Sequence, residues 1–339
     1  GGRARKSEDL WRRTRAPIAM MFIAAAAGSA KPLVMAFHAP IYNASQHDWA
    51  LYDWDSLDYV IVWRSILDRP DPDKFLIPYA HAHNSGVLIG GIDPAHDVLG
   101  NHTAEQEWID SLLTLLKAED ADGLNIDIEQ SKPGQKDAVT HLTCSLYSQL
   151  KSALPDALLT FDLGVYPNDQ QKSYDHKALS KCLDFITPMA YDMTGHHVGS
   201  NSPLPGITKC ASQYKALGIA PSQLVIGLPW YGYAFPCSND TLPGRGKPCA
   251  LGHTPTHIGI WEQGYGQMLD LFDAAEQSGT GQRGVTHYWD KETSTPWAEF
   301  WNASSPDRIV QAWYDNPRSL SLKYKAAEAH GYGGVAIWT

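Results

Sequence analysis

Short apolar runs recur along the chain, and stretches with a helical period separate them. The apolar runs span residues 32–39, 58–63, 87–92, 121–130, 157–165, 185–193, 223–233 and 331–339. Between them, apolar residues recur at steps of three and four, as at Val139, Leu142 and Leu146, which is the period of an amphipathic helix. Strands that alternate with helices are typical of a parallel sheet with helical crossovers. The pattern therefore predicts an α/β fold, a (β/α)8 TIM barrel, with its active site at the carboxyl ends of the strands.

The connection between the seventh and eighth runs is too long for one helix. Residues from about 235 to 313 hold a polar loop, a short helical stretch near 267–270 and β-like residues at 285–289. We expect a small insertion between strands seven and eight that forms one wall of the cleft, without being an independent domain. The catalytic barrel is then expected to span residues 31–339.

The first part of the chain has the composition of a secretory signal peptide at residues 1–30. Residues 3–15 are basic on balance, an apolar run follows, and small residues close the segment near Ala30. Because the apolar run is too short to cross a bilayer, we expect cleavage near Ala30; a tail or an uncleaved anchor is the alternative. Four acceptor sequons for N-glycosylation agree with secretion. They begin at Asn43, Asn101, Asn239 and Asn302.

Charge and composition narrow the class of partner. The formal net charge is −10, and no basic stripe occurs beyond residue 15, which argues against nucleic acid and anionic membrane as partners. The 12 Trp and 16 Tyr residues exceed what a core of this size usually needs, and aromatic rings offer large apolar faces with a polar tip. A neutral, sugar-like ligand is therefore favoured, and we expect a monomer.

Five cysteines in a secreted chain leave at least one without a partner in the same chain. Cys237 and Cys249 flank a polar loop, and we expect a disulfide across it. Cys182 and Cys210 form a second, less favoured pair. Cys144 falls within an amphipathic helical pattern, and we expect it to be a buried free thiol.

The run at 121–130 differs from the others because it carries acids. In an extended chain alternate side chains share a face, which puts Asn125, Asp127 and Glu129 on one face and apolar residues on the other. Two carboxylates this close repel each other, and the repulsion raises the proton affinity of one of them. A carboxyl group still protonated near neutral pH is what general acid catalysis needs. A bare D-x-E pattern also fits a surface turn or a metal site. Asp122 is out of phase, at the start of the strand, where it could brace the motif from beneath.

The longer pattern D-G-x-x-x-D-x-E, at residues 122–129, resembles the signature of glycoside hydrolase family 18, the chitinase-like group. The resemblance implies that Glu129 is the catalytic acid and that Asp127 orients the acetamido group of the substrate. It makes Asp122 and Asn125 further members of the substrate-binding motif. The family usually has Asp at the position of Asn125, and Asn there resembles its di-N-acetylchitobiase branch. We expect the Asn125 amide to donate to Asp127, which would lower the proton affinity of Asp127 and favour an acidic pH optimum.

Three further strand ends, those of the sixth, seventh and eighth runs, resemble the same family, and the seventh supplies Trp230 and Tyr231. The sixth run ends in an M-x-Y-D motif. The resemblance implies that Tyr191 donates a hydrogen bond to the acetamide oxygen of the substrate and that Asp192 makes contacts near the scissile sugar. The eighth run ends in Trp338, which by the same resemblance forms the floor of the subsite for the reacting sugar. The third run departs from the family pattern, since Leu88 replaces a serine. The substrate-contacting residues implied at these ends are Met189, Tyr191, Asp192, Trp230, Tyr231 and Trp338.

By this resemblance the chain is an O-glycosyl hydrolase that cuts GlcNAc-β-1,4-GlcNAc linkages in N-glycan cores or chitin oligosaccharides, in the lysosome or, alternatively, outside the cell. The retaining, substrate-assisted mechanism of the family implies neither a cofactor nor a metal. His81 and His83 could be taken for a metal pair, but a helix stop signal follows them. The alternatives are an endo-chitinase for longer chitin and a non-catalytic chitin-binding lectin; the acid at Glu129 argues against the lectin.

Overall fold

The computed structural model describes residues 31–39, 48–67, 75–94, 97–129, 134–170, 173–195, 197–238, 247–251, 261–277, 284–302 and 305–338. The predicted signal peptide and the predicted glycosylation sites Asn43 and Asn239 lie outside these residues. Of the other two sites, Asn101 precedes helix α4 (His102–Glu119) and Asn302 ends strand β11 (Thr295–Asn302). No helix in these ranges is both long enough and apolar enough to cross a membrane.

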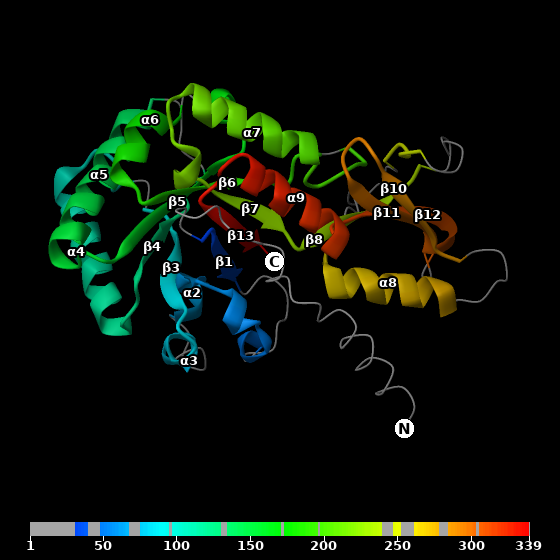
Figure 1. Cartoon of the computed structure of the whole chain (residues 1–339), viewed down its shortest axis with the longest axis horizontal. Helices are drawn as coiled ribbons and strands as arrows, with labels where there is room; N and C mark the ends of the chain where they lie inside the picture. The colour runs from blue at the N-terminus through cyan, green and yellow to red at the C-terminus, as the bar shows by residue number, and fades with distance from the viewer. Residues whose placement is uncertain are drawn as a thin grey trace.

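Within the described residues, eight parallel strands close into a barrel, in the order β1-β13-β7-β6-β5-β4-β3-β2 (Figure 1). Each strand lies within one of the eight predicted runs, except that β3 begins one residue earlier, so the predicted TIM barrel is confirmed. The strands are β1 (Leu33–His38), β2 (Tyr59–Trp63), β3 (Gly86–Ile92), β4 (Gly123–Ile126), β5 (Leu158–Gly164), β6 (Phe185–Met189), β7 (Val225–Pro229) and β13 (Gly334–Trp338).

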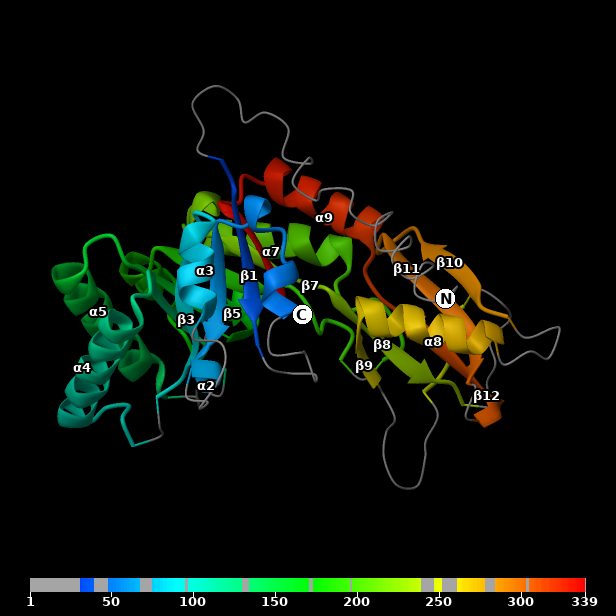
Figure 2. The same cartoon turned by 90° about the horizontal axis from the view of Figure 1, so that it is seen from below.

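Helices cover the outside of the barrel. Val139, Leu142 and Leu146 form the buried face of α5, as their spacing predicts. Figures 1 and 2 both show α4 and α5 side by side at one end of the molecule. The helices of the barrel are α2 (Arg64–Leu67), α3 (Leu76–Ala82), α4, α5 (Lys136–Ala153), α6 (His176–Leu179), α7 (Leu204–Ala216) and α9 (Pro317–Ala329), and α8 (Tyr265–Gln277) belongs to the insertion.

The barrel strands bury side chains on both faces. Met35, Ile61, Leu88, Val225 and Ala336 point inward and form one apolar cluster, while the alternate residues pack against the helices in a larger cluster. Strands that are covered on both faces appear in the sequence as continuous apolar runs. Polar chemistry is therefore confined to the strand ends and to a few inward positions.

The insertion is a small sheet of its own between β7 and α9. It begins at Tyr231 rather than near residue 235, and its strand order in the described residues is β10-β11-β12-β8-β9. Helix α8 packs on this sheet through Met268, Phe272 and Ala275. Figures 1 and 2 show the sheet beside the barrel, at the end opposite α4 and α5. The strands are β8 (Tyr231–Pro236), β9 (Trp261–Gly264), β10 (Thr286–Asp290), β11 and β12 (Ser305–Trp313).

One predicted disulfide is confirmed, and the assignment of the other cysteines was wrong. Cys237 and Cys249 are bonded, with a Cα–Cα distance of 5.6 Å. Cys144 is not a free thiol: it is bonded to Cys182, with a Cα–Cα distance of 4.9 Å. Cys144 lies at the edge of the buried face of α5 and meets the turn that follows α6, whereas Cys210 on α7 is the free cysteine, fully buried. Burial raises the pKa of the Cys210 thiol to about 12.

Candidate active site

The acidic motif lies at the end of β4, in the part of the barrel where catalytic groups are expected. Strand β4 ends at Ile126, so Asp127 and Glu129 follow the strand rather than belonging to it. The backbone N–H of Asp127 still donates to the carbonyl of Ile92 at 3.0 Å, which anchors the segment to the end of β3. Gly123 starts the strand where a Cβ would lie 2.2 Å from the carbonyl oxygen of Leu158, so close approach of β5 requires glycine there.

The prediction that Asn125 bonds Asp127 was wrong. The Asn125 amide nitrogen donates to Asp162 Oδ1 and to Thr160 Oγ1, both at 2.9 Å and both on β5. All three side chains are buried. The cause is the strand register, which pairs Asn125 with Thr160 and so directs the amide towards the neighbouring strand β5 rather than along its own chain.

The two motif acids have raised proton affinities. Desolvation, the charge of Glu129 and the charge of Asp93 raise the pKa of Asp127 to about 7. The expected lowering is therefore wrong in sign. Desolvation also raises the pKa of Glu129, followed by the charges of Asp192 and Asp93. Glu129 itself is exposed, so its carboxyl group is accessible beyond the end of β4.

Tyr191 lies against these acids and over an aromatic floor. Its ring stacks on Trp338, with centroids 6.2 Å apart and planes 10° from parallel. Burial and the charges of Asp162, Asp127, Glu129 and Asp192 raise the pKa of the Tyr191 hydroxyl well above its ordinary value, so this hydroxyl remains a hydrogen-bond donor. Gly227 makes room for the ring, because a Cβ there would lie 3.2 Å from Cε1 of Tyr191.

Asp192 is held in an unusual conformation. Its φ of 55° is in the left-handed region, which non-glycine residues adopt mainly where the surroundings fix them. Two hydroxyls, from Tyr231 and Tyr233, each donate to Asp192 Oδ1 at 2.6 Å. Its backbone N–H donates to Asn201 Oδ1, also at 2.6 Å. The carboxylate is therefore fixed on the strand-six side of the site, and the insertion strand β8 supplies both tyrosines.

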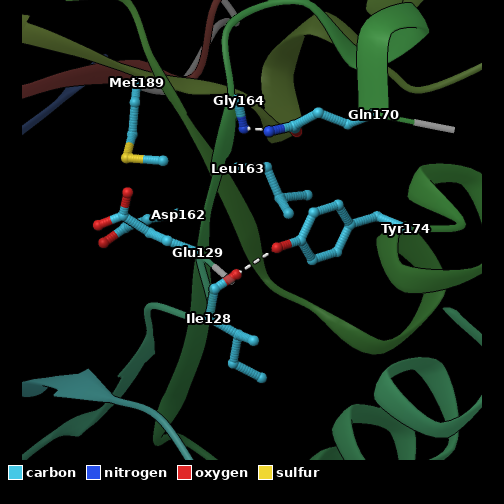
Figure 3. A pocket seen from close by; sticks show the side chains of 8 residues that line it. All are labelled: Ile128, Glu129, Asp162, Leu163, Gly164, Gln170, Tyr174 and Met189. Atoms are coloured by element: carbon cyan, nitrogen blue, oxygen red, sulfur yellow. Dashed lines mark hydrogen bonds between the residues drawn. The ribbon is translucent and has the colours of Figure 1, made fainter. Parts of the chain in front are cut away.

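A pocket opens between the ends of β4, β5 and β6 (Figure 3). Glu129, Asp162 and Met189 line it, so the acid that follows β4 and the last residue of β6 share one space. Tyr174 closes another side and donates to the carbonyl of Ile128 at 2.5 Å, which fixes the backbone next to Glu129.

Asp122 is a structural residue, which corrects its assignment to the substrate site. It lies at the opposite end of β4, where Oδ2 accepts from Val87 N at 2.7 Å and contacts His81 Nε2 at 2.8 Å. Asp58 and Asp184 do the same before β2 and β6: each accepts a backbone N–H of the preceding strand at 2.8 Å. These three aspartates brace neighbouring strands at the amino-terminal face of the barrel.

Trp230 also lies outside the site. Its Nε1 donates to the hydroxyl of Tyr324 on α9 at 3.3 Å, and its ring packs against the cluster between strands and helices. The register explains this orientation: Pro229 pairs with Trp338, so the next residue points away from the barrel interior. Tyr231 does belong to the site, through Asp192 and an edge-to-face contact with Tyr191.

The sequence analysis missed three polar residues of the site. Asp162 is buried beside Asn125, and burial followed by the charge of Asp127 raises its pKa well above the ordinary value, against the effect of the Asn125 hydrogen bond. Tyr233 donates a hydrogen bond to Asp192. The charge of Asp93 raises the pKa of Asp127 and of Glu129. A signal for Asp162 was present, since it lies two residues after Thr160 on the inward face of a predicted strand.

Comparison with known proteins agrees with this geometry. A family model described as Glycosyl hydrolases family 18 matches residues 86–339. Since the match covers more than half of the chain, the chain belongs to this family of O-glycosyl hydrolases.

The chain is also similar to individual chitobiases and chitinases. The chain is 29% identical over 324 residues to the di-N-acetylchitobiase of Rattus norvegicus, covering 89% of this chain and 81% of the relative. The Group IV chitinase of Ostrinia furnacalis has the same fold, with a TM-score of 0.75 at 18% identity over 91% of this chain and 92% of that one. A Cycas revoluta chitinase solved with (GlcNAc)3 has a TM-score of 0.73 at 20% identity, covering 91% of this chain and 94% of that one.

Proposed function

We propose that this chain hydrolyses the GlcNAc-β-1,4-GlcNAc linkage of N-glycan cores or chitin oligosaccharides, with retention of configuration. The observation that carries the proposal is the grouping of Asp127, Glu129 and Tyr191 at one barrel end, beside the indole of Trp338. Asp127 Oδ1 is buried and bonds no group within the described residues, so it can accept an N–H from a bound sugar. The similarity to a di-N-acetylchitobiase supports this linkage over others.

The reaction begins with proton transfer from Glu129. An enzyme that forms a covalent sugar adduct needs a second carboxylate about 5 Å across the bond from the acid. Asp162 is buried against Asn125 and Asp127 is turned inward, so neither is exposed as Glu129 is. The N-acetyl oxygen of the substrate therefore attacks the anomeric carbon. The bond to the leaving oxygen breaks, that oxygen takes the proton of Glu129, and an oxazolinium ion forms.

Asp127 and Tyr191 stabilise the charge that develops. Asp127 accepts the acetamide N–H, and the Tyr191 hydroxyl, which stays protonated, donates to the acetamide oxygen; both contacts strengthen as the ring forms. Water then attacks the anomeric carbon from the side of the leaving group and gives a proton to Glu129. The acid is restored and the product has the starting β-configuration.

The proposal is tested with a substrate panel. The purified chain is incubated with chitobiose-containing N-glycan cores, with their reduced forms and with long chitin, and the anomer formed first is recorded by NMR. We expect release of β-GlcNAc from the short substrates and no turnover of analogues that carry glucose or glucosamine at the cleaved residue. Rapid cleavage inside long chitin would favour the endo-chitinase, and an initial α-anomer would exclude the retaining mechanism.

We also propose that the protein acts as a lysosomal monomer. The predicted signal peptide and sequons support entry into the secretory route, and the raised pKa of Glu129 increases its protonated fraction in a mildly acidic compartment. Immunofluorescence against a lysosomal marker and gel filtration test the two parts. Accumulation in the medium, or elution at twice the chain mass, would contradict them.

A further inference from the structure

Three side chains with metal-ligating atoms meet on the outside of the barrel, between α4 and α5. They are His102, Glu105 and His141, and one ligand atom of each lies within 4.8 Å of the others. Glu105 Oε2 is 3.3 Å from His102 Nδ1 and 3.1 Å from His141 Nδ1. His102 and Glu105 lie on the first turn of α4, while His141 lies on α5. Figures 1 and 2 show these helices at the end of the molecule farthest from the insertion.

The carboxylate of Glu105 is buried and directs one oxygen towards the two imidazoles, as a metal ligand would. Its side chain is only 4% exposed, and burying a carboxylate is costly unless a cation or strong donors compensate it. Gly100 N–H donates to Oε1 at 2.9 Å, which leaves Oε2 facing the two imidazoles. Among the described residues no lysine or arginine pairs with Glu105. His141 Nδ1 forms a hydrogen bond with Oε2 at 3.1 Å. A cation held between Oε2 and the two ring nitrogens would replace this contact and place a positive charge on the carboxylate.

The two distances from Glu105 to the histidines fit a tetrahedral zinc ion, and the two histidine nitrogens lie within 4.8 Å of each other. Zn–N bonds of about 2.0–2.1 Å and Zn–O bonds of about 2.0–2.2 Å put neighbouring ligand atoms roughly 3.3–3.5 Å apart. The observed separations of 3.3 and 3.1 Å are close to that edge. The side chains of His102 and His141 are 83% and 53% exposed, so water can complete the coordination. Two imidazoles with one carboxylate favour Zn²⁺ over Mg²⁺ and Ca²⁺, which prefer oxygen ligands.

We propose that His102, Glu105 and His141 bind one Zn²⁺ ion that links the start of α4 to α5. The site uses none of the residues of the carbohydrate site, so it stands whether or not the proposed glycosidase activity is correct. Bound zinc would add a link between the two helices beside the paired side chains of Gln106 and Gln149, which already bond across them at 2.9 and 3.0 Å. Because the ion binds the folded state, it raises the unfolding temperature.

The test is zinc binding by the chelator-treated full chain, purified without a polyhistidine tag. Calorimetry with ZnCl2 at pH 7.5 is expected to give one site per chain, and zinc in excess is expected to raise Tm by a few degrees. Co²⁺ in place of zinc should give the intense visible absorption of a four-coordinate ion. No binding heat at micromolar to millimolar zinc would overturn the proposal.

Variants locate the ion. His141→Ala and Glu105→Gln should each weaken zinc binding at least tenfold; Glu105→Gln keeps an oxygen for the Gly100 N–H. His102→Ala removes a side chain that is 83% exposed, so it folds even if the Glu105 variant does not, and it should also lose affinity. His330→Ala, an exposed histidine near Thr208, and Glu129→Gln should bind zinc as the wild type does. Unchanged affinity in His102→Ala and His141→Ala would show that the zinc binds elsewhere and would refute the assignment.

Discussion

The side-chain amide of Asn125 donates to Asp162 at 2.9 Å, across from β4 to β5. This contact gives a buried carboxyl group a neutral partner, where an aspartate at position 125 would place a second acid. Because the Asn125 amide donates to Asp162, it does not donate to Asp127. The raised pKa of Asp127 has other causes, namely desolvation and the charges of Glu129 and Asp93. The hydrogen bond between Asn125 and Asp162 therefore links a donor and an acceptor on neighbouring strands in the barrel interior.

The first prediction exchanges that donor and acceptor. Asn125→Asp removes the donor, so we expect a loss of about 1–3 kcal/mol in the free energy of unfolding, larger at pH 7 than at pH 5 because a protonated acid can still donate. Asn125→Asp combined with Asp162→Asn restores one donor and one acceptor, and most of the stability should return. Urea unfolding of the wild type, the two single variants Asn125→Asp and Asp162→Asn, and the double variant measures the coupling energy between the two residues. Strictly additive effects would contradict the role of this hydrogen bond.

The second prediction concerns the pH profile. Glu129 must be protonated to act as an acid, so kcat/KM falls as pH rises through its pKa. Desolvation and then the charge of Asp192 raise that pKa; Asp192→Asn removes the charge but keeps an oxygen for the Tyr231 and Tyr233 hydroxyls. The basic limb of the profile should move to lower pH. If the limb stays where it is in the wild type, Asp192 does not act on Glu129 by charge.

The third prediction concerns stability. The pKa of Asp127 rises from 3.8 to about 7 on folding, so between these values the folded state binds more protons than the unfolded state. The stabilisation is complete below the lower value and is lost as pH rises through the upper one. In Asp127→Asn the fall in Tm from pH 4.5 to pH 7.5 should be smaller than in the wild type. An equal fall in both proteins would mean that Asp127 titrates normally.

The fourth prediction compares two tryptophans. Trp338→Ala removes the ring on which Tyr191 stacks, and kcat/KM should fall about tenfold or more, the equivalent of 1.4 kcal/mol or above. Trp230→Ala removes packing against α9, so it should lower Tm while KM stays near the wild-type value. Steady-state kinetics and thermal unfolding of both variants check this. A similar loss of activity in the two would show that Trp230 reaches the substrate after all.

The barrel could be predicted because its signal is local. Each strand is an apolar run, and the period of helices such as α5 is visible in Val139, Leu142 and Leu146. The pairing of Cys144 with Cys182 could not be predicted in this way, since it depends on how α5 meets the turn after α6. The zinc ligands His102 and His141 are similarly far apart in the sequence, and only the packing of α4 on α5 brings them together.

Part of the site was open to prediction but was assigned wrongly. Alternation along β7 is enough to turn Trp230 outward, since Pro229 shares its face with the inward Trp338 by register. Asp122 precedes a strand as Asp58 and Asp184 do, which is a repeated structural pattern rather than a catalytic one. The hydrogen-bond partner of Asn125, by contrast, could not be predicted from the sequence pattern, because it depends on the register between β4 and β5. The position of a residue within a motif does not by itself show whether the residue stabilises the barrel or binds the substrate.

The central claim is that Glu129 supplies the proton that starts cleavage. Its most direct test is turnover of a chitobiose-type substrate by the wild type and by Glu129→Gln, with binding of the same substrate measured by calorimetry. The amide keeps the shape of the side chain and removes the proton, so kcat should fall by about 10²–10⁴ while the dissociation constant changes little. Comparable turnover in the two proteins would contradict the account.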